Sequence, residues 1–215
     1  MIPPKQPQQA LHQLLGDAAL TITALPGTDL RLWLLAPDNM ARAFDGAETR
    51  RILEQPPYWS FCWASGLVIA QWLAEYPELV RGKRVLDFGC GSAVAGIAAA
   101  AQGAQVCACD LDPIAQAAAQ ANAQLNGVQI ECCSSLPEQH FDLLIAADVL
   151  YDRDNFAFLT PFRQHAQQVL LADSRVKNFA HSGYQLLAER RGLTLPDLGE
   201  AEEFAQVRLY QSLNP

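Results

Sequence analysis

The sequence predicts an α/β domain built on a mostly parallel sheet, and three observations lead to this class. Short apolar runs alternate with alanine-rich helical stretches between residues 84 and 150, and acids stand at the ends of those runs. A glycine-rich turn joins the first run to the helix that follows it. Such alternation is typical of a parallel sheet with crossover helices on its faces. With 215 residues, half of them hydrophobic, the chain is long enough for one core and a short appended segment.

The first 54 residues are predicted to form an extension that precedes the main sheet. Gln8 to Leu15 carries apolar residues at helical spacing, and Gly16 is placed to end that helix. The apolar runs 20–25 and 30–35 flank a Pro-Gly-Thr-Asp turn, which predicts a β-hairpin. We therefore divide the chain into an N-terminal helix and hairpin, residues 1–54, and a main domain, residues 55–215.

Residues 56–66 are unusually rich in aromatic side chains and lead into an apolar helix from Leu67 to Ala74. An indole has a flat apolar face and one N–H donor, which suits Trp63 to cover a bound cofactor and keep water from it. A place in the core is the alternative for Trp63, and it is the interpretation that we favour for Trp59.

A strand, a glycine turn and a helix follow one another between residues 83 and 102. Glycine tolerates positive φ, so Gly89 and Gly91 suit a tight turn whose amides face a bound molecule. The next glycine, Gly96, comes too late for the dinucleotide-binding fingerprint. Asp87 would repel a pyrophosphate but attract an ammonium or a sulfonium. These residues therefore favour S-adenosylmethionine as the cofactor.

A second acid, Asp110, ends the next apolar run, residues 104–109, about one βα unit after Asp87. Its carboxylate can accept hydrogen bonds from both hydroxyls of a ribose. Asp112 and Pro113 are suited to begin the helix that runs to Leu125, and residues 128–132 predict a third strand. The alternative is that Asp87 and Asp110 only cap strand ends on an unrelated α/β sheet.

The two acidic motifs resemble motifs I and II of the class I, seven-β-strand S-adenosylmethionine-dependent methyltransferases, and the resemblance covers roughly residues 55–212. It implies a Rossmann-like, seven-stranded, mostly parallel sheet with helices on both faces and an antiparallel last strand. It also implies that Trp63, Asp87, Gly89, Gly91 and Asp110 bind S-adenosylmethionine. Ser134 falls where related enzymes contact adenine, which adds it to the cofactor-binding residues.

The predicted fourth strand and its exit, residues 141–151, carry the most informative motif for the substrate. Asp148 and Tyr151 resemble the Asp-x-x-Tyr motif of a family of protein-lysine methyltransferases that includes the enzyme acting on the electron transfer flavoprotein β-subunit. Trp63 and Gly66 match that family too. The resemblance implies that Asp148 contacts the cofactor and recruits the lysine, and that Tyr151 shapes the pocket for the lysine. Capping by Asp148 and packing by Tyr151 are the alternatives.

The C-terminal part is predicted to complete the sheet. Residues 170–173 indicate a fifth strand and Val176 to Arg191 a helix that Gly192 ends, before antiparallel strands at 192–195 and 204–210. The family often has Asp-Pro-Gly-Arg after this strand, whereas this chain has Asp-Ser-Arg at 173–175. This difference leaves one wall of the substrate site open, and Arg175 is interpreted as surface charge.

Composition argues against several other classes of protein. The net charge is −8 and no basic run interrupts the acidic balance, which disfavours a nucleic-acid substrate. The six cysteines lack metal-binding spacing and the four histidines stand singly, so we expect core thiols and no metal site. Because the N-terminus resembles no signal peptide and no apolar run reaches membrane length, we expect a cytoplasmic protein with no membrane partner.

The function that these observations predict is transfer of the S-adenosylmethionine methyl group to a lysine nitrogen of a protein. Among protein substrates, the resemblance favours the electron transfer flavoprotein β-subunit first and ribosomal proteins second. Methylation of a small amine or a heterocyclic nitrogen is the alternative enzyme activity. A non-catalytic S-adenosylmethionine-binding module is the alternative from another class.

Overall fold

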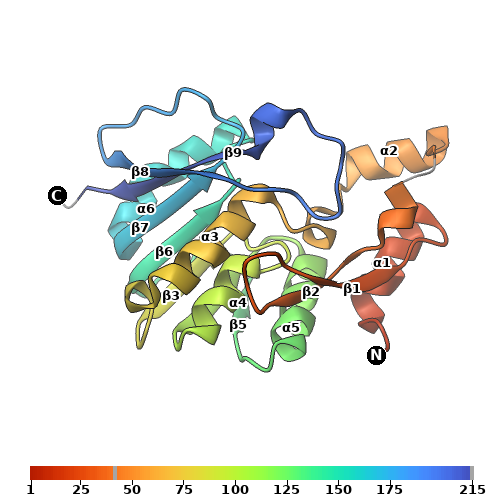
Figure 1. Cartoon of the computed structure of the whole chain (residues 1–215), viewed down its shortest axis with the longest axis horizontal. Coiled ribbons are helices and arrows are strands. Elements are labelled where there is room, and N and C mark those ends of the chain that lie inside the picture. The colour runs from red at the N-terminus through yellow and green to blue at the C-terminus, as the bar shows by residue number, and fades with distance from the viewer. Residues whose placement is uncertain (41–42, 214–215) are drawn as a thin grey trace.

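The computed structural model describes residues 1–40 and 43–213, and its centre is a seven-stranded sheet (Figure 1). The strand order is β5-β4-β3-β6-β7-β9-β8. Neighbouring strands from β5 to β7 are parallel, and only β9 runs antiparallel to both of its neighbours. The predicted sheet with an antiparallel last strand is therefore confirmed. Its strands are β3 (Arg84–Phe88), β4 (Gln105–Cys109), β5 (Glu131–Cys133), β6 (Phe141–Ala147), β7 (Ala166–Asp173), β8 (Tyr184–Arg191) and β9 (Gln206–Ser212).

Helices cover both faces of the sheet, as predicted. On the face turned to the viewer in Figure 1 lie α3 (Ala64–Glu75), α4 (Val94–Ala101) and α5 (Pro113–Leu125), and α6 (Leu159–His165) lies behind. Alanine fills most of α4, so this helix lies close to β3 and β4. Short 3-10 helices connect the larger elements: η1 (Pro37–Met40), η2 (Tyr58–Ser60), η3 (Pro77–Leu79), η4 (Arg153–Phe158) and η5 (Glu202–Ala205).

The N-terminal extension contains the predicted helix, α1 (Lys5–Leu15), and the predicted hairpin of β1 (Leu20–Ala24) and β2 (Arg31–Leu35). It also contains α2 (Gly46–Glu54), which the sequence analysis missed. Leu11 and Leu15 of α1 share an apolar cluster with Trp33 of β2 and Ala118 of α5. The extension therefore lies directly against the helix that follows β4, on the right of Figure 1.

The predicted helix from Val176 to Arg191 is wrong. Residues 174–183 form an irregular connection, and the rest of the segment is β8, which pairs with β9 over its whole length apart from one bulge. Leucine, alanine, glutamate and arginine give β8 a helical composition, and its pairing with β9 overrides that preference. The strand predicted at 192–195 is also wrong, because only Leu195 makes a bridge, to Cys62. The third strand begins at Glu131, later than predicted.

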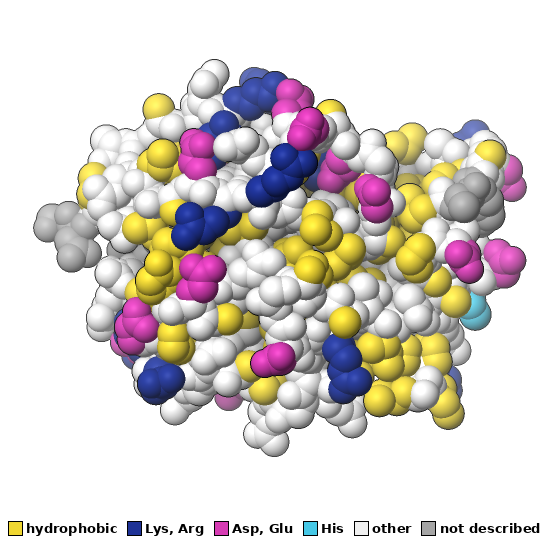
Figure 2. Space-filling model, in the orientation of Figure 1, with side chains coloured by type: hydrophobic (Ala, Val, Ile, Leu, Met, Phe, Trp, Pro, Cys, Tyr) yellow, Lys and Arg dark blue, Asp and Glu magenta, His cyan; other side chains and the backbone are white. Residues whose placement is uncertain are grey.

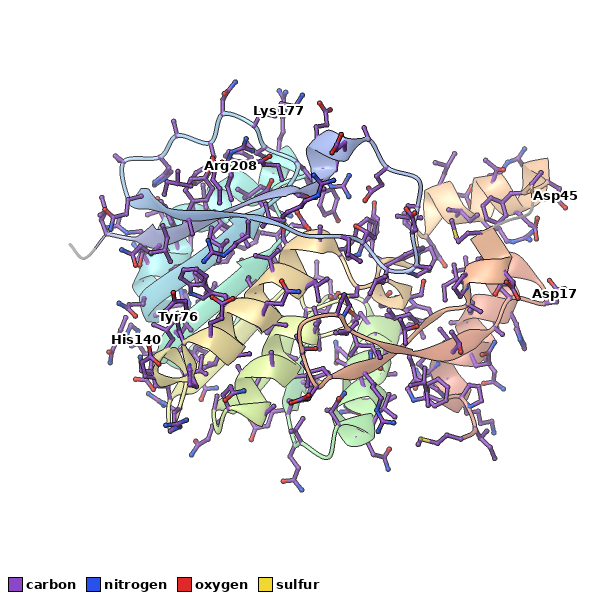
Figure 3. The ribbon with its side chains drawn as sticks, in the orientation of Figure 1. Asp17, Asp45, Tyr76, His140, Lys177 and Arg208 are labelled. Atoms are coloured by element: carbon purple, nitrogen blue, oxygen red, sulfur yellow. The ribbon has the colours of Figure 1, made fainter. Side chains whose placement is uncertain are left out.

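The carboxyl ends of the parallel strands and the C-terminal half of α1 lie at one edge of the sheet, away from Tyr76 and His140, which precede β3 and β6 (Figure 3). On the face seen in Figure 2, basic side chains are interspersed with acidic ones, mainly over β8 and β9. Arg190 and Arg208 there make ion pairs with Glu75 and Glu189. Among the described residues, no helix combines the length and apolar character needed to cross a membrane.

Candidate active site

One cavity of about 1140 Å³ opens at the carboxyl ends of β3, β4 and β6. Every residue that the sequence analysis assigns to the site lines it: Trp63, Asp87, Gly89, Gly91, Asp110, Ser134, Asp148 and Tyr151. Open α/β sheets bind their ligands in this position. The cavity has a glycine-loop end and an aromatic end, and α1 adds a side wall through Gln13 and Leu14. The fold thus brings all the predicted residues together.

The glycine loop has the backbone geometry that its sequence predicts. Gly89 and Gly91 have φ angles of 65° and 50°. The N–H groups of Gly89 and Cys90 donate to the carbonyl of Cys109 at 2.9 and 3.1 Å, which ties the turn to the end of β4. Ala93 also has a positive φ, 60°, just before α4 begins. The loop therefore turns sharply from β3 into α4 along the wall of the cavity.

Asp87 is buried at the end of β3, and its Oδ2 accepts a hydrogen bond from Gly96 N at 2.8 Å. No described residue donates to its Oδ1. Burial is the main cause that raises the pKa of this carboxyl from 3.8 to about 7, and nearby Asp110 adds to the effect. A cationic ligand in the cavity would stabilise the ionised form. Asp87 is therefore suited to bind a cation through the free oxygen.

Asp110 stands on the opposite side of the loop, and both of its oxygens face main-chain donors. Oδ2 accepts from Gly91 N at 2.9 Å and Oδ1 from Asp112 N at 3.0 Å. Partial burial raises the pKa of this carboxyl, against the effect of these hydrogen bonds. Each oxygen keeps a second lone pair for a ligand hydroxyl. Ser134, after β5, is exposed and lines the same part of the cavity.

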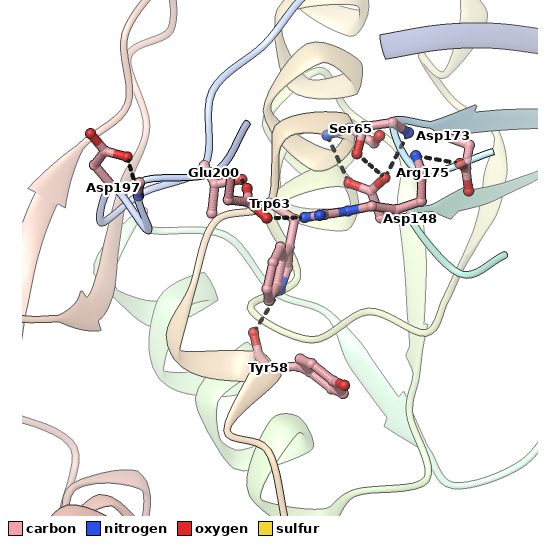
Figure 4. Close-up of polar contacts among 11 residues, drawn as sticks. Tyr58, Trp63, Ser65, Asp148, Asp173, Arg175, Asp197 and Glu200 are labelled. Carbon is pink, nitrogen blue, oxygen red and sulfur yellow. Dashed lines mark hydrogen bonds and ion pairs between the residues drawn. The ribbon is translucent and has the colours of Figure 1, made fainter. Parts of the chain in front are cut away.

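Asp148 follows β6 and connects three elements. Its Oδ2 accepts from Ser65 N at 3.0 Å, in the first turn of α3 (Figure 4). Its Oδ1 accepts from the N–H and hydroxyl of Ser174 at 2.9 and 2.7 Å, just after β7. Its φ of 49° is rare for a residue with a side chain, and only 7% of the residue is exposed. Asp148 thus fixes the start of α3 against the sheet as well as lining the cavity.

Aromatic side chains form the other end of the cavity. The rings of Tyr58 and Tyr151 lie 5.4 Å apart, and those of Tyr58 and Trp63 lie 5.8 Å apart. The Trp63 indole donates to the Tyr58 carbonyl at 3.0 Å, which fixes the indole plane. Burial and the neighbouring Tyr58 raise the pKa of Tyr151 to about 12. Tyr151 is therefore a neutral phenol at physiological pH and can donate a hydrogen bond.

Sequence reasoning missed two charged residues of this site. Arg175 lines the cavity, so its interpretation as surface charge is wrong. Its guanidinium lies 5.5 Å from the Trp63 ring centroid and 2.5 Å from Glu200, which is also in the cavity wall. Nothing local in the sequence links Arg175 to Glu200. Trp59 is buried as expected but lines the cavity as well.

The cysteines and the other side chains that can bind a metal ion add no further group to the site. All six cysteines are free thiols, and four of them are buried, in accord with the prediction of core residues. Cys132 and Cys133 are only half-buried. Within residues 1–40 and 43–213, no three His, Cys, Asp or Glu side chains are grouped to hold a metal ion.

Known proteins with similar sequences are methyltransferases. Residues 68–152 match the family model described as ribosomal protein L11 methyltransferase (PrmA). The electron transfer flavoprotein beta subunit lysine methyltransferase of Mus musculus is 33% identical over 162 residues, which cover 68% of this chain and 62% of that protein. The chain is thus similar in sequence to protein methyltransferases over about two thirds of its own length. It spans about three fifths of the length of that enzyme and of its Rattus norvegicus counterpart.

Solved structures of methyltransferases show the same fold. The ribosomal protein L11 methylase of Lactobacillus delbrueckii subsp. bulgaricus has a TM-score of 0.52 and 24% identity, covering 68% of this chain and 78% of that one. Magnesium protoporphyrin IX methyltransferase of Synechocystis PCC 6803, solved with bound SAM, has a TM-score of 0.55 and 16% identity, covering 82% and 88%. At these identities the similarity concerns the fold alone.

Proposed function

We propose that the protein transfers the methyl group of S-adenosylmethionine to a lysine side-chain nitrogen of a protein. The observation that carries this proposal is the single cavity that joins the glycine loop to the aromatic end with Asp148 and Tyr151. The 33% identity to a lysine methyltransferase supports it. In-line transfer needs donor and acceptor in one water-poor site, and this cavity has room for both.

The glycine-loop end fits S-adenosylmethionine, which supplies an electrophilic methyl group on a sulfonium. The Oδ1 of Asp87 accepts no hydrogen bond from a described residue, so it is available to a cationic group. Asp110 has two oxygens that can accept from the ribose hydroxyls. Gly89 and Gly91 leave the main chain open to close approach. We assign Ser134 to the adenine and Trp63 and Asp148 to the boundary between donor and acceptor.

The aromatic end fits a lysine side chain. A free lysine amine has a pKa of about 10.4 and is mostly protonated at neutral pH, so it must lose a proton before it attacks the methyl group. The rings of Tyr58, Trp63 and Tyr151, of which Tyr58 and Tyr151 are partly exposed, would displace water from an amine bound between them, which would lower that pKa. Asp148 attracts the incoming ammonium, while Tyr151 contributes a hydroxyl at the mouth of the cavity. These residues position the amine and prepare it for the reaction.

The proposed protein substrate is the electron transfer flavoprotein β-subunit, because several relatives about 33% identical are named for it. Ribosomal protein L11 is the second candidate, since the family model that matches residues 68–152 bears its name. The expectations of a cytoplasmic location and of no nucleic-acid partner stay predictions from the sequence.

The test is methyl transfer from radiolabelled S-adenosylmethionine to each purified candidate protein, followed by separation of proteins from small molecules. Label on the flavoprotein subunit, located on a lysine by peptide mass spectrometry, supports the proposal. Label on L11 supports lysine transfer with the second substrate. Label confined to a small amine would replace the proposed function, and cofactor binding without transfer to any acceptor would favour a non-catalytic module.

A further inference from the structure

Arg175 places a cation at the aromatic end of the cavity, where the proposed function requires an ammonium to enter. Its guanidinium lies between two aromatic rings, 5.5 Å from the Trp63 centroid and 4.5 Å from the Phe204 centroid. Its main-chain N–H donates to Asp173 Oδ1 at 2.7 Å, which fixes the turn after β7. Only 20% of the side chain is exposed, so water screens its charge poorly. An unpaired arginine here would repel a lysine.

Glu200 supplies the opposite charge from the loop between β8 and β9. Its Oε1 is 2.5 Å from Arg175 Nη2, and its Oε2 accepts from the Thr194 hydroxyl at 2.9 Å (Figure 4). Its side chain is 21% exposed. The same loop is joined to the aromatic segment, residues 56–66, by two hydrogen bonds between Cys62 and Leu195, both 2.8 Å long. The loop therefore holds Glu200 in place beside Arg175.

We propose that Glu200 is a positioning residue that neutralises Arg175, so that Arg175 does not offset the attraction of Asp148 for an acceptor ammonium. This inference rests on the proposed function, since it names what the same site needs from its acceptor. The pair has a second consequence: its two charges offset each other, so that together they change the pKa of a bound amine little. Loss of Glu200 would lower that pKa, and loss of Arg175 would raise it.

The test compares Glu200→Gln, Arg175→Gln and the double variant with the wild type. Gln preserves the size of Glu200 and removes its charge. For Glu200→Gln we expect KM for the acceptor to rise about tenfold, the effect of one unit charge near an ammonium in a partly hydrated site. For Arg175→Gln we expect KM to fall. The double variant should return to within about threefold of the wild type, because neither unpaired charge remains.

The pH profile of kcat gives a second readout with opposite signs. We expect it to move to lower pH in Glu200→Gln and to higher pH in Arg175→Gln. The other titratable groups around the acceptor position, which stay unchanged in all variants, are Asp87, Asp148, Asp173, Tyr58 and Tyr151. Glu203→Gln is the matched control. Glu203 lies three residues after Glu200 and pairs with Lys177, two residues after Arg175. Both of these side chains are at least half exposed and lie outside the cavity wall, so KM should not change.

The outcomes separate this inference from the proposed function. If both single variants change KM in the same direction and the double variant shows no rescue, the pair is only structural and the inference is overturned. If Glu200→Gln does not fold, Arg175→Gln alone tests the inference: a fall in KM supports it, and a rise in KM overturns it. If the wild type methylates only a small amine, lysine transfer fails, yet the same series with that amine still tests the pair. Absence of transfer to every acceptor would overturn both.

Discussion

Gly96 is a position where adding one methyl group should damage the cofactor end of the site. It is the third residue of α4, and its N–H donates to Asp87 Oδ2. A Cβ at this position would lie 2.8 Å from that oxygen and 3.2 Å from Val106 Cγ1. Gly96 does not have a positive φ, so space and not backbone conformation excludes the side chain.

Three terms set the size of the effect of Gly96→Ala. Alanine in place of glycine stabilises a helix interior by about 1 kcal/mol. Overpacking against Asp87 and Val106 costs about 1–3 kcal/mol. Weakening the hydrogen bond to a buried carboxylate costs about 1.5–3 kcal/mol more. We therefore expect a net loss of about 1.5–5 kcal/mol in the free energy of unfolding. S-adenosylmethionine should bind at least tenfold more weakly, because the Asp87 carboxylate moves.

Urea unfolding and calorimetric titration with S-adenosylmethionine measure the two effects. Gly46→Ala is the matched control, since Gly46 begins α2, has no neighbour within 4 Å of its Cβ position and does not have a positive φ. That variant should be as stable as the wild type or slightly more stable. If Gly96→Ala behaves like Gly46→Ala in both measurements, the close approach of α4 to Asp87 does not constrain this site.

Three further predictions concern protonation, packing and turnover. Burial raises the Asp87 pKa to about 7, so the protonated carboxyl stabilises the folded protein at low pH. The stability of the wild type relative to Asp87→Asn should therefore be fully present below pH 4 and fall by up to about 4 kcal/mol as the pH rises through 7. A pH-independent difference in urea unfolding would contradict this. Asn122→Ala should lose about 2–4 kcal/mol in the same assay because it leaves two buried partners unsatisfied, whereas the half-buried Asn126→Ala should lose less than about 1 kcal/mol. Tyr151→Phe should lower kcat about tenfold without changing cofactor affinity, while Tyr76→Phe, outside the cavity wall, should leave both unchanged; equal turnover in the two variants would remove Tyr151 from the mechanism.

The cofactor end of the site could be predicted because its chemistry is local in the sequence. Gly89 and Gly91 need positive φ angles for the turn, and Asp87 and Asp110 follow from the ends of two short strands. Each of these features depends on residues a few positions apart. The helix α2 had a readable signal as well, since Asp45 and Glu48 form a capping box, and sequence analysis overlooked it.

The part of the cavity wall that Arg175 and Glu200 form could not be predicted, because it depends on strand pairing across the C-terminal part of the chain. β8 has a helix-like composition and becomes a strand only through β9. The position of the β8–β9 loop follows from that pairing, and with it the contact between Arg175 and Glu200. A helix in place of β8 would have left Arg175 without this partner. The wrong helix and the missed ion pair are therefore one error.

The structure also changes how the Asp-x-x-Tyr motif should be tested. Asp148→Asn replaces an acceptor with an NH₂ group that must face the N–H of Ser65 or the N–H and hydroxyl of Ser174. Two donors in contact leave a buried polar group unsatisfied, at a cost of about 1–3 kcal/mol. Lost activity in that variant would then reflect a displaced α3 as readily as a lost contact to lysine. Tyr151 and the Arg175–Glu200 pair reach the acceptor end without holding helix to sheet, so their variants report on lysine binding more directly.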